Sequence, residues 1–191
     1  SAGEWTNFLD VLNNNPGSIN AARRPAVGTS NNGFPIATFA TNDAVSVPLS
    51  AAINNQTATL GWALWVKVGN LAGFNTLLSI STGTAGASAA KLQLFLSSTE
   101  AITIDAYMPG GNGRRYVSTP VVAQDTWTFI RFAYDSGLGG DANLSVFINE
   151  VPFGGAFSNL TGGITLGVLP VVTGTLLIGN ATANALTLCG S

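Results

Sequence analysis

Two acidic residues are the first candidates for chemistry, because glycoside hydrolysis requires a pair of carboxylates flanking the scissile bond. The segment EAITID offers Glu100 and Asp105. These residues are five positions apart, so on a regular strand their side chains point to opposite faces. The chain contains no histidine, which excludes a Ser-His-Asp triad and imidazole-based metal sites. We therefore expect no catalytic residues and a protein that is not an enzyme.

A second group of candidate ligands lies in the glycine-rich segment DSGLGGDAN, residues 135–143. Asp135, Asp141 and Asn143 supply carboxylate and amide oxygens, which are the ligands that Ca²⁺ prefers. Their spacing does not follow the EF-hand pattern, and acidic loops of this kind are more often plain connections between strands. We expect a connecting loop that requires no cofactor, with a calcium site as the alternative.

Two arginine pairs hold most of the positive charge, because Arg23-Arg24 and Arg114-Arg115 are four of only seven basic residues. A guanidinium binds carboxylates through two parallel hydrogen bonds and stacks on aromatic rings. The pairs therefore predict either a contact between subunits or simply a solvated arm and hairpin tip. Recognition of an acidic sugar is a third interpretation.

The composition narrows the classes of partner. Charged residues make up 8% of the chain and the formal net charge is −2, so we expect no attraction to nucleic acid or to an anionic membrane. No run approaches the roughly 18 apolar residues of a membrane span, and SAGEWTNFLD does not read as a signal peptide. The only cysteine is Cys189, so no disulfide within the chain is possible.

The N-terminal part differs from the rest of the chain. Residues 5–13 carry apolar side chains at the spacing of one helical face, and Pro16-Gly17 would end such a helix. Residues 14–35 are rich in Asn, Gly and Pro and predict an extended arm. We expect residues 1–35 to form a helix and arm that serve assembly through Trp5, Phe8, Leu9, Leu12, Arg23 and Arg24.

From about residue 36 the hydrophobic period changes to two, which is typical of strands. Short strands that follow one another with turns and no helices between them predict a sandwich or a barrel. The expected strands are 36–40, 44–49, 59–68, 75–81, 91–97, 101–108, 114–119, 126–135, 143–151, 164–169 and 174–180. In the strand 59–68, Trp62 falls on a wholly apolar face and is expected in the core, whereas Trp65 shares its face with Lys67.

The order of these segments resembles the laminin G-like, concanavalin A-like jelly-roll family. The marks of that resemblance are TLGWALWVKV with Trp65, the strand that Trp127 opens and Tyr134-Asp135 ends, and Ile178-Gly179. The resemblance implies an all-β, two-sheet antiparallel jelly-roll sandwich over residues 36–191, beside the short helix and arm. One departure is Asn149-Glu150, which stands where the family commonly has Asp-Gly, so the turn is expected to differ.

Two classes of function remain open. The low charge and the amphipathic segment favour a non-catalytic structural protein on a virion surface, such as a bacteriophage decoration or fibre protein, with other subunits or copies of itself as partners. The alternative is an extracellular carbohydrate-binding module, because exposed aromatic rings stack on sugars. Its candidate glycan-binding residues are Trp65, Tyr107, Arg114, Arg115 and Tyr116.

Overall fold

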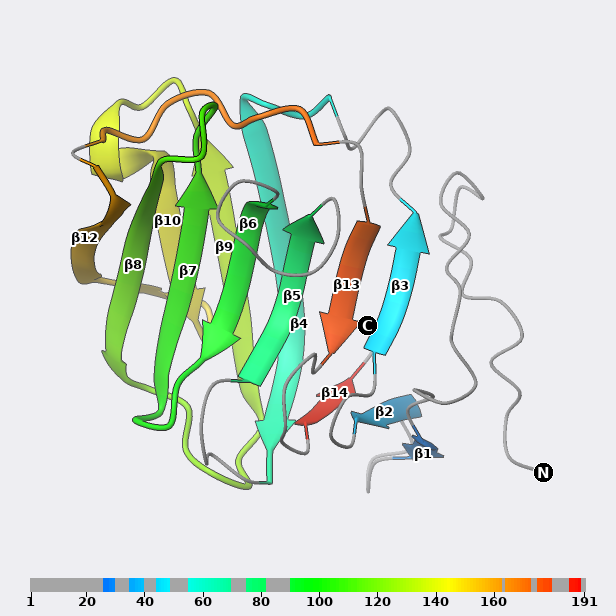
Figure 1. Ribbon diagram of the computed structural model, residues 1–191. Coiled ribbons are helices and arrows are strands. Elements are labelled where there is room, and N and C mark those ends of the chain that lie inside the picture. The colour runs from blue at the N-terminus through cyan, green and yellow to red at the C-terminus, as the bar shows by residue number, and fades with distance from the viewer. Residues whose placement is uncertain are drawn as a thin grey trace.

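Two antiparallel seven-stranded sheets pack face to face in the computed structural model (Figure 1). The structure describes residues 26–29, 35–39, 44–48, 55–69, 75–81, 90–162, 164–172, 175–179 and 186–189. This architecture confirms the predicted two-sheet jelly-roll sandwich. The predicted helix at 5–13 lies outside the described residues, as do the assembly candidates Trp5, Phe8, Leu9, Leu12, Arg23 and Arg24.

The first sheet lies at the back of Figure 1 and the second at the front. In spatial order the first sheet contains β1 (Ala26–Thr29), β2 (Pro35–Phe39), β14 (Leu186–Cys189), β4 (Thr59–Val68), β9 (Thr128–Asp135), β10 (Leu144–Ile148) and β11 (Val151–Phe153). The second contains β12 (Gly155–Thr161), β8 (Gly113–Pro120), β7 (Ala101–Tyr107), β6 (Ala90–Leu96), β5 (Asn75–Ser81), β13 (Thr175–Gly179) and β3 (Ala44–Pro48). A short 3-10 helix, η2 (Gly140–Asn143), joins β9 to β10.

The core lies between the sheets, because alternate residues of each strand point inward. Ile130 and Phe132 of β9 are fully buried, and Leu94 of β6 and Ile104 of β7 pair directly across the second sheet. Trp62 packs against this core, as its place on the apolar face of 59–68 predicts. Burial of such side chains contributes roughly 1.5–3 kcal/mol each.

Most of the expected strands are confirmed to within two residues, but three expectations are wrong. Residues 26–29, expected in the arm, form β1 and pair with β2. Residues 164–169, expected as a strand, form an irregular loop. The expected strand 143–151 is two strands, β10 and β11, joined by a two-residue turn. The sequence does not predict β12, because the polar and small residues of this strand do not alternate with apolar ones.

The turn between β10 and β11 contains Asn149 and Glu150, where the family commonly has Asp-Gly. Asn149 and Glu150 both have positive φ, 50° and 65°, the backbone conformation of a tight hairpin turn. The Asn149 side chain also accepts a hydrogen bond from the Phe129 amide at 2.9 Å. The sequence change therefore leaves a tight turn in place, although Glu150 occupies a conformation that glycine adopts at lower energy.

Candidate functional site

Arg114 and Arg115 are neighbours on β8, so their side chains point to opposite faces of the second sheet. Each guanidinium forms two parallel hydrogen bonds with an aspartate from another segment. Arg115 pairs with Asp105 on β7, directly across the sheet, with N–O distances of 2.7 Å. Arg114 lies on the same face as the core residue Tyr116 and pairs with Asp141 of η2. The charges of Arg114 and Arg115 are therefore separated on two faces, and each is paired with an aspartate.

The Arg115–Asp105 pair belongs to a polar row on the outward face of the second sheet. Asp105 is 2% exposed, and Gln93 of β6 pairs beside it in the sheet. Gln93 donates to the Ser79 hydroxyl at 3.1 Å and accepts from the Tyr107 hydroxyl at 3.3 Å. Burial, together with the Asp105 charge, raises the pKa of Tyr107 to about 12, and Arg115 acts in the opposite direction. Asp105, Gln93, Ser79 and Tyr107 are buried in this row, whereas the Arg115 side chain is partly exposed.

Arg114 forms a more open cluster with side chains of η2 and β12. Its Nε and Nη2 donate to the two carboxylate oxygens of Asp141, at 2.8 and 2.6 Å. Its Nη1 donates to the Asn159 Oδ1 on β12, at 2.8 Å. The guanidinium also lies 5.7 Å from the centre of the Phe157 ring. Hydrogen bonding to Asp141 raises the pKa of Arg114, so this cation remains charged at every accessible pH.

A hollow of about 330 Å³ opens beside this cluster, and we call it the corner pocket. Its volume lies at the lower end of the roughly 300–1,000 Å³ typical of small-molecule sites. The pocket therefore has room for one small unit of a ligand. Its lining residues are Arg114, Gly140, Asp141, Asn159, Ile164 and Thr165.

The loop 164–172 supplies one wall of the corner pocket and is held in place at several points. The Tyr134 hydroxyl donates to the Gly167 carbonyl at 2.5 Å, and the Gly167 amide donates to the Met108 sulfur at 3.3 Å. The buried Asn143 amide donates to the Leu166 carbonyl at 3.0 Å. These contacts fix the backbone next to Thr165, so the pocket wall is built before any ligand binds.

The pocket offers both donors and acceptors to a ligand. Arg114 uses three of the five N–H groups of a guanidinium, which leaves two. The Asp141 side chain is 39% exposed, and each of its oxygens accepts one bond from Arg114 and keeps a second acceptor position. The Asn159 Nδ2 has no hydrogen-bond partner within the described part of the chain. Such a mixture suits a ligand whose groups both donate and accept.

The three residues proposed for calcium each form a contact within the chain. Asp141 binds Arg114, and Asn143 binds the Leu166 carbonyl. Asp135 accepts a hydrogen bond from the Gly137 amide at 2.9 Å, a local turn contact. Among the described residues, no group of three His, Cys, Asp or Glu side chains is placed to hold a metal ion. The segment 135–143 connects β9 to β10, and the calcium site stays a prediction.

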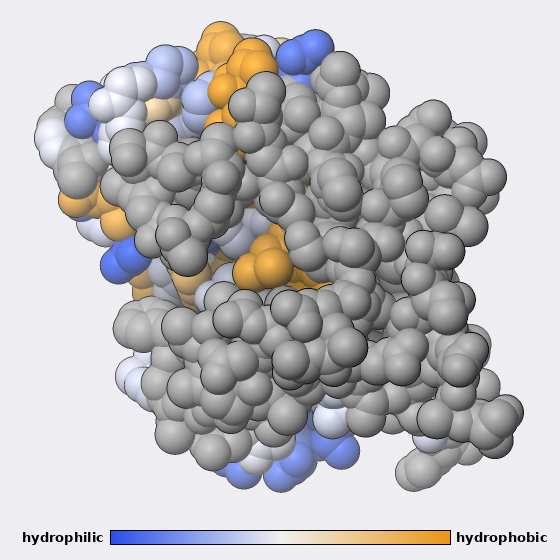
Figure 2. Space-filling model, turned by 45° about the vertical axis from the view of Figure 1, so that its right-hand side comes forward, coloured by the Kyte–Doolittle hydropathy of each residue, from blue (hydrophilic) through white to orange (hydrophobic). Residues whose placement is uncertain are grey.

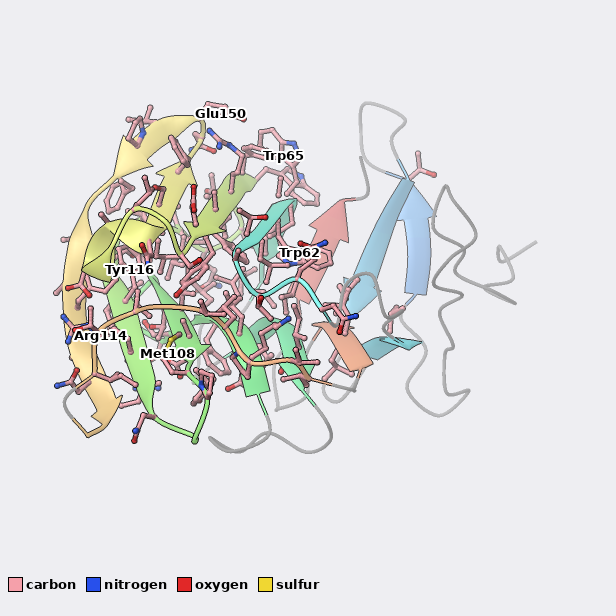
Figure 3. The ribbon with its side chains drawn as sticks, turned by 90° about the horizontal axis from the view of Figure 1, so that it is seen from above. Trp62, Trp65, Met108, Arg114, Tyr116 and Glu150 are labelled. Carbon is pink, nitrogen blue, oxygen red and sulfur yellow. The ribbon has the colours of Figure 1, made fainter. Side chains whose placement is uncertain are left out.

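The aromatic candidates fall in three different environments. Tyr116 is 2% exposed and its hydroxyl donates to the Phe153 carbonyl, so its ring is not available for stacking on a ligand. Tyr107 is 6% exposed within the polar row. Trp65 is 41% exposed on the outer face of the first sheet, beside Phe129 at 5.1 Å between ring centres. In Figure 3, Trp65 lies on the side of the molecule away from Arg114. Trp65 and the corner pocket therefore do not form one site.

The two acidic residues considered for hydrolysis lie in unlike positions. Asp105 is buried in the middle of β7 and bonded to Arg115. Glu100 precedes β7 in a turn with a φ of 62°. Four lining residues of the corner pocket were not expected as site residues from the sequence: Asn159, Gly140, Ile164 and Thr165. Only the pairing of β12 with β8 places Asn159 opposite Arg114, and β12 carries no clear strand pattern.

The surface mixes apolar and polar residues. Figure 2 shows small orange hydrophobic areas beside pale and blue residues on the face that it presents. The large exposed hydrophobic residues of the described chain are Trp65, Leu138, Val151, Val168 and Val171. Within the described ranges, no helix has the length and apolar character needed to cross a membrane.

Together, the two antiparallel sheets define a jelly-roll domain, and the polar corner pocket opens at one end of it. The chain belongs to the concanavalin A-like lectin/glucanases superfamily, since the family model Laminin_G_3 matches residues 39–190. This match confirms the family resemblance drawn from the order of the segments. None of the curated proteins compared with the chain matches it.

Several solved structures share the fold. A sialidase of Trypanosoma rangeli in complex with sialic acid is 13% identical, with a TM-score of 0.63, over 98% of this chain and 28% of the sialidase chain. The CBM40 of a Ruminococcus gnavus IT-sialidase, bound to alpha2,3 sialyllactose, is 11% identical, with a TM-score of 0.50, over 72% of this chain and 78% of the CBM40 chain. A leech intramolecular trans-sialidase is 14% identical, with a TM-score of 0.55, over 81% of this chain and 25% of that enzyme.

This chain spans about a quarter of the length of the sialidases that it matches. At these identities the likeness shows the fold alone.

Proposed function

We propose that the chain is a non-catalytic carbohydrate-binding module and that the corner pocket holds one sugar unit. The observation that carries this proposal is that four polar residues from four segments line one open hollow. They are Arg114 of β8, Asp141 of η2, Asn159 of β12 and Thr165 of the loop 164–172. Sugar hydroxyls both donate and accept hydrogen bonds, so this set is complementary to them.

The similar structures support the same class of ligand. One of them is a CBM40 bound to alpha2,3 sialyllactose, and it is matched over most of its own length. The non-catalytic part of the proposal is supported by Asp105, whose carboxylate is buried and committed to Arg115. The virion-surface role, its subunit partners and the extracellular location remain predictions from composition. Glycan binding takes precedence because a described pocket and the similar structures both support it.

A glycan array probed with the purified chain and two variants tests the proposal. Asn159→Ala removes an amide that lines the corner pocket and is expected to lower binding at least tenfold. Ser158→Ala is the matched control, because Ser158 is exposed on the same strand and points to the opposite face. Its binding is expected to equal that of the unchanged chain. Equal binding by both variants contradicts the assignment of the site to this pocket.

Trp65→Ala distinguishes the other exposed candidate. Trp65 is expected to contribute nothing to binding in the corner pocket, because it lies on the outer face of the first sheet. Loss of glycan binding in Trp65→Ala, with full binding in Asn159→Ala, would place the glycan on the first sheet instead.

A further inference from the structure

We propose that the corner pocket selects uncharged sugars over acidic ones, because Asp141 already neutralises Arg114, the one cation among the described residues that line it. This inference rests on the proposed glycan-binding function and names the chemical class of its ligand. It differs from what the similar solved structures would indicate, since the CBM40 chain is bound to alpha2,3 sialyllactose, which carries a carboxylate.

The geometry of Arg114 carries the inference. A guanidinium recognises a ligand carboxylate best through two parallel N–H groups on one edge. In this chain the edge formed by Nε and Nη2 is taken by both oxygens of Asp141, at 2.8 and 2.6 Å. The remaining N–H groups lie on Nη1 and Nη2, and Nη1 also binds Asn159. They can donate to hydroxyl oxygens of a ligand, whereas the edge formed by Nε and Nη2 is already occupied by Asp141.

The net charge of the pocket also favours a neutral ligand over an acidic one. Arg114 and Asp141 are the charged residues among its lining, and their charges cancel. A sugar carboxylate that entered would lose water while meeting no net positive charge, and it would lie close to the half-exposed Asp141 carboxylate. A neutral sugar meets no such repulsion, and its hydroxyls can donate to Asp141 while accepting from the Asn159 Nδ2.

The other described arginines do not supply a free cation either. Arg115 is paired with Asp105 at 2.7 Å, and it points to the opposite face of β8 from Arg114. Arg131 pairs with Glu150 at 3.2 Å and lies over the Phe147 ring at 3.7 Å. Every arginine in the described part of the chain is therefore paired with a carboxylate.

Asp141→Asn tests the inference directly. The change keeps the size of the side chain and removes its charge, which leaves Arg114 uncompensated in the pocket. The probe is an array on which each neutral glycan, lactose among them, is printed beside its sialylated form, such as 3′-sialyllactose. The unchanged chain is expected to bind the neutral member of each pair. In Asp141→Asn the ratio of acidic to neutral binding is expected to rise at least tenfold, and the gain should shrink as salt is added.

Asp105→Asn is the matched control, because it makes the same change in net charge and frees Arg115 outside the pocket. Its ratio of acidic to neutral binding is expected to stay at the value of the unchanged chain. Circular dichroism spectra and melting temperatures show whether each variant is folded.

The outcomes separate the two proposals. Preference of the unchanged chain for the acidic members, with loss of that binding in Asn159→Ala, overturns the inference and leaves glycan binding in place. An equal rise in Asp141→Asn and Asp105→Asn also overturns it, because overall charge would then explain the effect. Absence of binding to any printed glycan overturns the proposed function and the inference with it.

Discussion

Removing the Arg115 side chain is expected to lower the free energy of unfolding by about 3 kcal/mol. The Asp105 carboxylate is 2% exposed and receives two hydrogen bonds of 2.7 Å from Arg115. Breaking a buried ion pair by removing one partner costs about 3–5 kcal/mol, because the other charge stays buried without compensation. The Arg115 side chain is 37% exposed, so water reaches its end of the pair and the lower limit applies. In a chain of this size the loss corresponds to a melting temperature lower by about 6–12 °C.

A double-mutant cycle measured by urea unfolding at pH 7 isolates the pair. Arg115→Met keeps most of the aliphatic stem and removes the charge. This variant is expected to show the full decrease in the free energy of unfolding, about 3 kcal/mol. Asp105→Asn is expected to cost only about 1 kcal/mol, because the freed guanidinium at this half-exposed position can be hydrated. The double variant is expected to be more stable than the sum of the two changes predicts, by about 2 kcal/mol.

Two results would refute this reasoning. A loss below about 0.5 kcal/mol in Arg115→Met would mean that the buried carboxylate does not depend on its partner. Additive losses in the double variant would mean that the two side chains act independently, despite the bonds between them. A changed urea dependence of unfolding would mark a variant whose unfolded state had also changed.

Three further changes test other features of the fold. Tyr107 keeps its proton in the folded chain up to a pH of about 12, whereas an unfolded tyrosine loses it near pH 10. In this interval the folded state therefore binds more protons than the unfolded state. The free energy of unfolding is expected to fall by roughly 2–3 kcal/mol between pH 9 and pH 12, and Tyr107→Phe should not show this fall. Gly155→Ala would place a Cβ 2.5 Å from the Tyr116 Cζ and is expected to cost about 2–3 kcal/mol in urea unfolding; an unchanged midpoint would contradict the close approach. Glu150→Gly relieves a positive φ of 65° and is expected to stabilise the chain by about 0.5 kcal/mol, read as a raised melting temperature; a lowered value would mean that its exposed ion pair matters more.

The sequence predicts those parts of the fold whose pattern is local. Residues 59–68 alternate strictly enough that the predicted strand and β4 have the same bounds. Trp62 is placed against the core by the same alternation. By contrast, the split of 143–151 depends on two residues with positive φ, and neither is a glycine that would signal a turn. Patterns of hydrophobicity therefore locate strands better than they locate the turns between them.

The candidate site was predicted only in part, because its residues meet through pairing over long stretches of chain. Arg114 and Asp141 were each singled out for chemistry, but for different sites, a glycan contact and a metal. Their bond joins residues 27 positions apart, and the bond from Arg114 to Asn159 spans 45. No property of either residue alone indicates its partner. The pairing of β8 with β12 and the position of η2 supply that information.

The position of β14 has a consequence for the way the chain folds during synthesis. This strand, Leu186–Cys189, lies between β2 and β4, so it is an inner strand of the first sheet although it is the last described element along the chain. Among the described strands, β14 alone links β1 and β2 by hydrogen bonds to the block formed by β4, β9, β10 and β11, so this link is absent until β14 leaves the ribosome. Both exposed strand edges would be open to wrong pairing during that time. The nascent chain therefore completes its first sheet only after nearly all of the described residues have been made, and we expect chaperone contact to concentrate on β2 and β4.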